Sequence, residues 1–110
     1  MYVYDQANNL AKSIQESKEY LEYKKAREEM KSNPETKGKI DEFEKIRFEA
    51  QVLAFQGEKQ DEEKMKKLQE LHQMLMQDAK IKEYFEIEVR FNVMLADVNK
   101  IISESVKEVL

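Results

Sequence analysis

The 110-residue chain contains no cysteine, which excludes disulfide bonds, thiolate nucleophiles and cysteine-ligated zinc or iron–sulfur centres. It has no tryptophan, one proline and two glycines, so residues that interrupt helices are scarce. No apolar run approaches the roughly 18 residues that a membrane helix needs. The early part of the chain also lacks the continuous apolar segment of a signal peptide. We therefore expect a cytoplasmic protein without a membrane association.

Residues that favour helices are abundant. Ala, Glu, Lys, Leu and Arg supply 52 of the 110 residues. Charged residues make up 38% of the chain and hydrophobic residues 41%, and the hydrophobic residues are spaced along the chain rather than grouped in blocks. This composition predicts an all-α single domain over residues 1–110, an antiparallel helical hairpin bundle of four to five helices, two of them long.

The hydrophobic spacing places the helices. A first arm carries two apolar stripes and ends near Ser32, and Ser17 lies between them as a cap or kink, so the arm is one bent helix or two. Asn33 and Pro34 predict the start of a third helix, and Gly57 predicts its end. The fourth helix is expected to start at Asp61-Glu62-Glu63. After a cap at Asp78, a fifth helix of about 25 residues or more is expected.

Gly38 lies one turn inside the third helix. Glycine in this position weakens a helix by about 1 kcal/mol relative to alanine, unless close packing requires its small size. The sequence by itself does not distinguish these two cases.

Two of the predicted helices are apolar on more than one side. Phe48, Val52 and Phe55 fall opposite the stripe that runs from Ile40 to Leu53, and Val89 and Val93 lie away from the main stripe of the last helix. Either one monomer folds back and buries both sides, or a symmetric dimer uses one of them. We favour a homodimer, and we predict that these five residues form a dimer or partner interface.

Catalytic or metal-binding groups are few. His72 is the single histidine and borders an apolar stripe, which favours a packing residue over a metal ligand or general base. The residue three before it is Gln69, so the Glu-x-x-His pair of a helical metal site is absent. Acidic clusters such as Asp41 with Glu42 and Glu44 lie beside lysines and lack a glycine-turned loop. We expect no enzyme, no cofactor and no metal site.

Eight basic residues occur between Lys24 and Arg47, with six acidic residues interleaved among them. Nucleic-acid surfaces depend on a net positive charge, and an excess of two is small for that purpose. A solvated helix surface is therefore the favoured interpretation of this region. An RNA-associated or RNA-processing accessory factor using residues 24–47 is the alternative function.

Four short motifs carry a resemblance to a known family. They are Tyr-Asp-x-Ala-Asn at Tyr4 to Asn8, Ser-Lys-Glu-Tyr at Ser17 to Tyr20, the Asn33-Pro34 helix start, and Asp-Val-Asn-Lys-Ile-Ile at Asp97 to Ile102. With these marks the whole chain resembles the YlbF/YmcA family of small bacterial helical proteins, and most closely its YheA-like branch.

The resemblance implies an all-helical, dimeric, cytoplasmic protein of Gram-positive-type bacteria. Better-known relatives resemble regulatory subunits that act in competence, sporulation and biofilm control and are tied to RNA processing through an endoribonuclease. Some of those relatives bind iron–sulfur clusters through cysteines, which this chain does not have. We therefore expect a non-enzymatic dimeric adaptor or regulatory factor that acts through protein–protein contacts.

Overall fold

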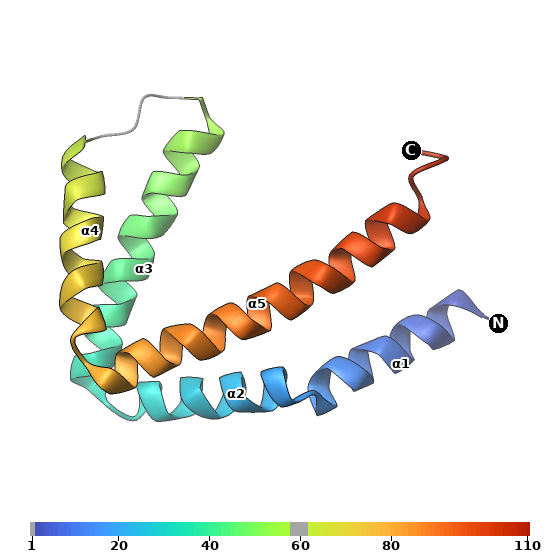
Figure 1. Ribbon diagram of the computed structural model, residues 1–110, viewed down its shortest axis with the longest axis horizontal. Coiled ribbons are helices and arrows are strands. Elements are labelled where there is room, and N and C mark those ends of the chain that lie inside the picture. The colour runs from blue at the N-terminus through green and yellow to red at the C-terminus, as the bar shows by residue number, and fades with distance from the viewer. Residues whose placement is uncertain (1, 58–61) are drawn as a thin grey trace. The chain divides into compact units, whose positions relative to one another are not determined.

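The computed structural model describes residues 2–57 and 62–110, and these residues form five helices without a strand. The helices are α1 (Val3–Glu16), α2 (Lys18–Lys31), α3 (Pro34–Phe55), α4 (Glu62–Met76) and α5 (Ala79–Ser105), shown in Figure 1. The longest are α3 with 22 residues and α5 with 27. The prediction of an all-α fold with two long helices is confirmed.

The chain divides into two compact units. One unit comprises Met1–Arg27 and Tyr84–Leu110, and the other comprises Glu28–Glu83. Helices α2 and α5 each contribute residues to both units. We call them the terminal unit and the hairpin unit. The prediction of a single domain over 1–110 stays a prediction.

The first arm of the chain consists of two helices, separated at Ser17. This residue has extended backbone angles (φ −69°, ψ 151°), which end α1. Its hydroxyl donates to the Ile14 carbonyl at 2.6 Å and accepts from the Tyr20 backbone N–H at 3.2 Å. The Ser17 side chain therefore hydrogen-bonds to the last turn of α1 and also caps the start of α2. At the start of α2 it satisfies a backbone donor that has no partner within the helix.

The predicted boundaries of α3 are confirmed. The Asn33 side chain accepts from the Thr36 backbone N–H at 3.3 Å, and Pro34 occupies the first helical position. Proline costs little there, since its missing N–H would have no helical partner. The helix ends at Phe55 with Gln56 as its C-cap, and Gly57 follows with a φ of 72°, in the left-handed region that glycine enters without steric strain.

In the hairpin unit, α3 and α4 lie side by side (Figure 1) and bury apolar residues between them. Ile40, Phe43, Ile46 and Ala50 of α3 are buried, as is Leu75 of α4. The predicted α3 stripe is less buried at its end, where Leu53 is only half-buried. Two exposed ion pairs, Lys64 with Glu49 and Lys67 with Glu42, also join the two helices.

The starts of α4 and α5 follow the sequence signals. Glu62 and Glu63 occupy the first turn of α4, where the helix dipole favours negative charge. Asp61, predicted as part of the same start, lies outside the described residues. Asp78 accepts from the backbone N–H groups of Lys80 at 2.9 Å and Ile81 at 3.4 Å, which confirms it as the cap of α5.

Gly38→Ala is expected to raise the free energy of unfolding by up to about 1 kcal/mol. Gly38 lies within α3 with no left-handed φ, and a Cβ atom added there would meet nothing within 4 Å. Close packing therefore does not require a glycine. Urea unfolding followed by circular dichroism measures the effect. A loss of stability would contradict the open surroundings of this position.

Gly57→Ala is the matched control, because it makes the same change at a residue with φ of 72°. An alanine at a left-handed position is strained, so this variant is expected to lose stability.

Candidate interaction surface

In the terminal unit, α2 and α5 pack in antiparallel directions. The Tyr20 ring lies 6.3 Å from that of Phe91, and the Tyr23 ring lies 6.1 Å from that of Tyr84. Residue numbers thus rise along α2 while they fall along α5. Arg27, one turn after Tyr23 on α2, donates a hydrogen bond to the Tyr84 hydroxyl of α5. The second apolar stripe predicted for the first arm consists of Tyr20, Tyr23, Arg27 and Met30, and all four are half-buried or buried.

A polar network crosses this helix pair. The Tyr23 hydroxyl donates to Glu88 Oε2 at 3.1 Å. Arg27 Nη1 donates to the Tyr84 hydroxyl at 3.1 Å and to the Tyr23 hydroxyl at 3.4 Å. Glu88 is 6% exposed and Tyr84 is 4% exposed. Buried polar groups are costly unless they are paired, so a slip of α2 along α5 would leave Glu88 without the Tyr23 donor. The network therefore favours one register.

Sequence reasoning missed Glu88, although its position carried a signal. Ile81, Tyr84, Glu88 and Phe91 follow one another at intervals of three, four and three residues, the spacing of one helix face. A carboxylate on that face predicts a buried, hydrogen-bonded acid. Its donor Tyr23 lies 65 residues away in the chain, so the pairing itself required the tertiary structure.

Tyr84 keeps its proton within this network. Burial raises the pKa of Tyr84 above its ordinary value of 10.0, the neighbouring Tyr23 adds to the increase, and the Arg27 guanidinium opposes it. Tyr84 is therefore a neutral phenol at physiological pH. The hydroxyls of Tyr23 and Tyr84 are occupied by contacts within the helix pair. This arrangement stabilises the α2–α5 contact.

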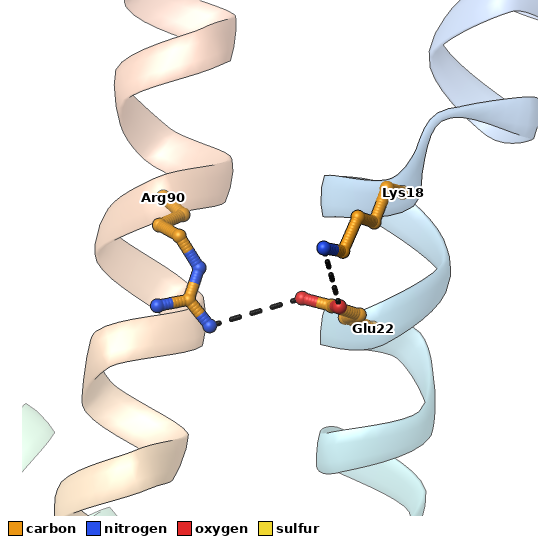
Figure 2. A network of polar contacts seen from close by, with 3 residues as sticks. All are labelled: Lys18, Glu22 and Arg90. Carbon is orange, nitrogen blue, oxygen red and sulfur yellow. Dashed lines mark ion pairs between the residues drawn. The ribbon is translucent and has the colours of Figure 1, made fainter.

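Exposed charges lie beside the buried network. Figure 2 shows Glu22 of α2 between Lys18 of the same helix and Arg90 of α5, each with an N–O distance of 3.8 Å. All three side chains are solvated, and such pairs contribute between zero and about 1 kcal/mol each. The buried groups therefore contribute more to the specificity of this contact than the surface ion pairs do.

The five residues predicted as an interface are mostly exposed. Phe48 is 65% exposed and Phe55 95%, while Val52 is half-buried, and all three lie on α3 away from its buried stripe. Val89 and Val93 are more than half exposed on α5. Phe48, Val52 and Phe55 belong to the hairpin unit, and Val89 and Val93 belong to the terminal unit. Their role as an interface stays a prediction.

Several basic residues between positions 24 and 47 have partners within the chain. Lys37 pairs with Asp41 at 2.6 Å and Lys39 with Glu35 at 3.4 Å. The Arg47 guanidinium lies 5.4 Å from the centre of the Phe43 ring. These contacts reduce the positive charge that the region could offer to a phosphate backbone. The RNA-associated alternative stays a prediction that no observation here favours.

His72 is exposed on α4, and its ring lies 5.8 Å from that of Phe43. This ring contact agrees with a packing role, although the residue is less buried than the sequence suggests. Among residues 2–57 and 62–110, no three histidine, aspartate or glutamate side chains gather as metal ligands would. In the same ranges no helix combines the length and apolar character needed to cross a membrane.

Comparisons with known proteins show which family the chain resembles. A family model described as control of competence regulator ComK, YlbF/YmcA, matches residues 3–107. A UPF0342 protein of Symbiobacterium thermophilum is 38% identical over 104 residues, covering 94% of this chain and 93% of that protein. A UPF0342 protein of Alkalihalophilus pseudofirmus is 34% identical over 107 residues, with coverages of 97% and 91%.

A solved structure shares the fold. It is described as a protein of unknown function (DUF964) from Bacillus stearothermophilus and superposes with a TM-score of 0.82. The superposition covers 96% of this chain and 93% of that chain at 16% sequence identity. Such a likeness supports the helical architecture alone.

Proposed function

Because the chain belongs to the YlbF/YmcA family, whose description is control of the competence regulator ComK, we propose that it is a non-enzymatic, dimeric, cytoplasmic adaptor or regulatory factor. It acts by binding other proteins rather than by transforming a substrate. The observation that supports this most directly is the pair of large aromatic side chains exposed on α3, Phe48 and Phe55. Exposed aromatic side chains grouped on one surface mark partner sites.

The use of the polar groups supports the non-enzymatic part of the proposal. The strongest cluster of titratable side chains, formed by Tyr23, Arg27, Tyr84 and Glu88, is engaged internally between two helices. A catalytic group must be able to reach a substrate atom. These side chains instead satisfy one another, which supports a structural task for them.

Sedimentation analysis tests the dimer. The wild-type chain is expected to sediment at twice its mass of 13.1 kDa at micromolar concentration. A species of monomer mass under these conditions would remove the dimeric part of the proposal.

Phe48→Glu tests the adaptor surface on α3. The tagged wild-type chain is expected to capture a partner protein from its host cells, and Phe48→Glu to lose at least about 90% of that capture, since a charge replaces a desolvated aromatic anchor. Quantitative mass spectrometry of the captured proteins is the measurement. Helicity should be unchanged, because Phe48 does not belong to the hairpin core.

Gln69→Glu is the matched control, because it adds the same charge at an exposed position on α4 of the same unit. Equal capture by the wild type and both variants would place the partner surface elsewhere than α3.

A further inference from the structure

Helix α1 presents an apolar stripe that the chain covers only in part, since Leu10 is 37% exposed and Ile14 is half-buried. Val3, Ala7, Leu10 and Ile14 recur at intervals of four, three and four residues, which places them on one face. No residue of α1 is buried, and Val3 is 76% exposed. An amphipathic helix normally buries such a stripe against a neighbour. Here the stripe is available to a partner.

A second stripe, also covered only in part, continues along α5. The face that packs on α2 at Tyr84, Glu88 and Phe91 extends at the same spacing to a set of later residues, Leu95, Val98 and Ile102. Burial falls along this stripe: Leu95 and Val98 are half-buried, and Ile102 is 50% exposed. In Figure 1, α1 and the last turns of α5 lead to the two chain ends, and both belong to the terminal unit.

Both stripes lie in segments that are poor in charge. Residues 2–15 carry only Asp5 and Lys12, and residues 91–103 carry only Asp97 and Lys100. These are four charged residues among 27, whereas 38% of the whole chain is charged. Low charge together with exposed tyrosine and aliphatic residues is the composition of the core of a protein interface. Each segment is electrically neutral, so two copies meet without net repulsion.

We propose that these two stripes, which we call the terminal seams and define as Val3, Leu10, Ile14, Leu95, Val98 and Ile102, form the contact with a second copy of this chain. A neutral surface does not suit a phosphate backbone, and a helix that lies on an anionic membrane carries a basic polar face. A second copy supplies a surface that is apolar and neutral in the same way. Two-fold symmetry then provides each favourable contact twice.

This inference rests on the dimer of the proposed function and gives that dimer a location. It separates two tasks. The terminal seams hold two copies together, and the α3 set of Phe48, Val52 and Phe55 remains available to a different protein. The seams contain none of the five residues that the sequence singled out as an interface.

Leu10→Glu and Ile102→Glu test the terminal seams by sedimentation equilibrium of the full chain. Each is expected to raise the dimer dissociation constant by about 100-fold or more, because symmetry removes the contact twice. Glutamate is a good helix former, so helicity should stay at the wild-type level. Asn9→Glu and Ser103→Glu add the same charge beside these positions but off the seams, and they should remain dimeric, as should Phe48→Glu.

Single cysteines give a second measurement, because the chain has no thiol of its own. Leu10→Cys is expected to form a covalent dimer with a short bismaleimide linker, and Phe48→Cys is expected to remain a monomer on the denaturing gel. This result depends on proximity between copies and does not require the interface to be weakened.

The outcomes separate the two proposals. A monomeric Phe48→Glu variant together with a dimeric Leu10→Glu variant would overturn the location at the terminal seams and leave the proposed dimer intact. A wild-type chain that is monomeric and gives no cross-link would overturn both. Cross-linking of Leu10→Cys to a different protein from host cells, and never to itself, would also overturn the second copy as the occupant.

Discussion

Ile40→Ala is expected to lower the free energy of unfolding by about 2–5 kcal/mol, the cost of emptying a core site that cannot fully collapse. Ile40 is 0% exposed and lies one turn before Phe43 on α3, whose ring contacts that of His72 on α4. The hairpin unit has few fully buried side chains, so each one accounts for a large share of its apolar packing. Urea unfolding followed by circular dichroism gives the change in midpoint and slope.

Phe48→Ala provides the comparison on the same helix. The deleted side chain is larger than that of Ile40, but it is 65% exposed, and its loss should change the unfolding free energy by no more than about 0.5 kcal/mol. Burial rather than size then decides the result. If both variants lost equal stability, Phe48 would be part of the folded core and could not serve as a free partner surface.

Tyr23→Phe is expected to lower the free energy of unfolding by about 1–3 kcal/mol, although it removes a single oxygen atom. The hydroxyl donates to Glu88 at 3.1 Å and receives a hydrogen bond from Arg27 at 3.4 Å. Without it, a carboxylate that is 6% exposed loses a donor that water cannot easily replace. The ring remains, so its contact with Phe91 at 5.1 Å is unaffected.

Tyr4→Phe makes the same chemical change on α1, where the side chain is exposed, and should stay within about 0.5 kcal/mol of the wild type. Chemical denaturation of both variants is the measurement. A Tyr23→Phe variant with the unfolding free energy of the wild type would indicate that Glu88 is satisfied without this hydroxyl. The network would then not specify the register of α2 on α5.

The boundaries of the helices were predictable because local chemistry sets them. Asn33 and Asp78 cap helices by accepting from backbone N–H groups only two or three residues away, and Gly57 ends α3 through its own backbone freedom. Ser17 was recognised as a cap or kink, and the structure places two helices there. None of these features depends on distant parts of the chain.

Side-chain pairings across helices were not predictable in the same way. The spacing of Arg27 after Tyr20 and Tyr23 is typical of a helix face, but nothing local indicates that Tyr84 accepts its hydrogen bond. The sequence also led us to expect one apolar face of α5 and a second around Val89 and Val93. Exposure of the terminal seams became apparent only once the packing of α2 was known, because α2 covers one part of the α5 stripe and leaves the rest open.

The sequence by itself determined the all-α class, the order of the helices, the caps at Ser17, Asn33 and Asp78, and the lack of cysteine chemistry, because composition, spacing and capping act within a few residues. Tertiary structure decided which face of each helix is buried. It also decided which polar side chains meet, as at Tyr23 and Glu88. Both depend on contacts between residues far apart in the chain. An apolar stripe has the same spacing whether it is covered by a neighbouring helix or by a partner molecule, so spacing alone does not distinguish the two cases.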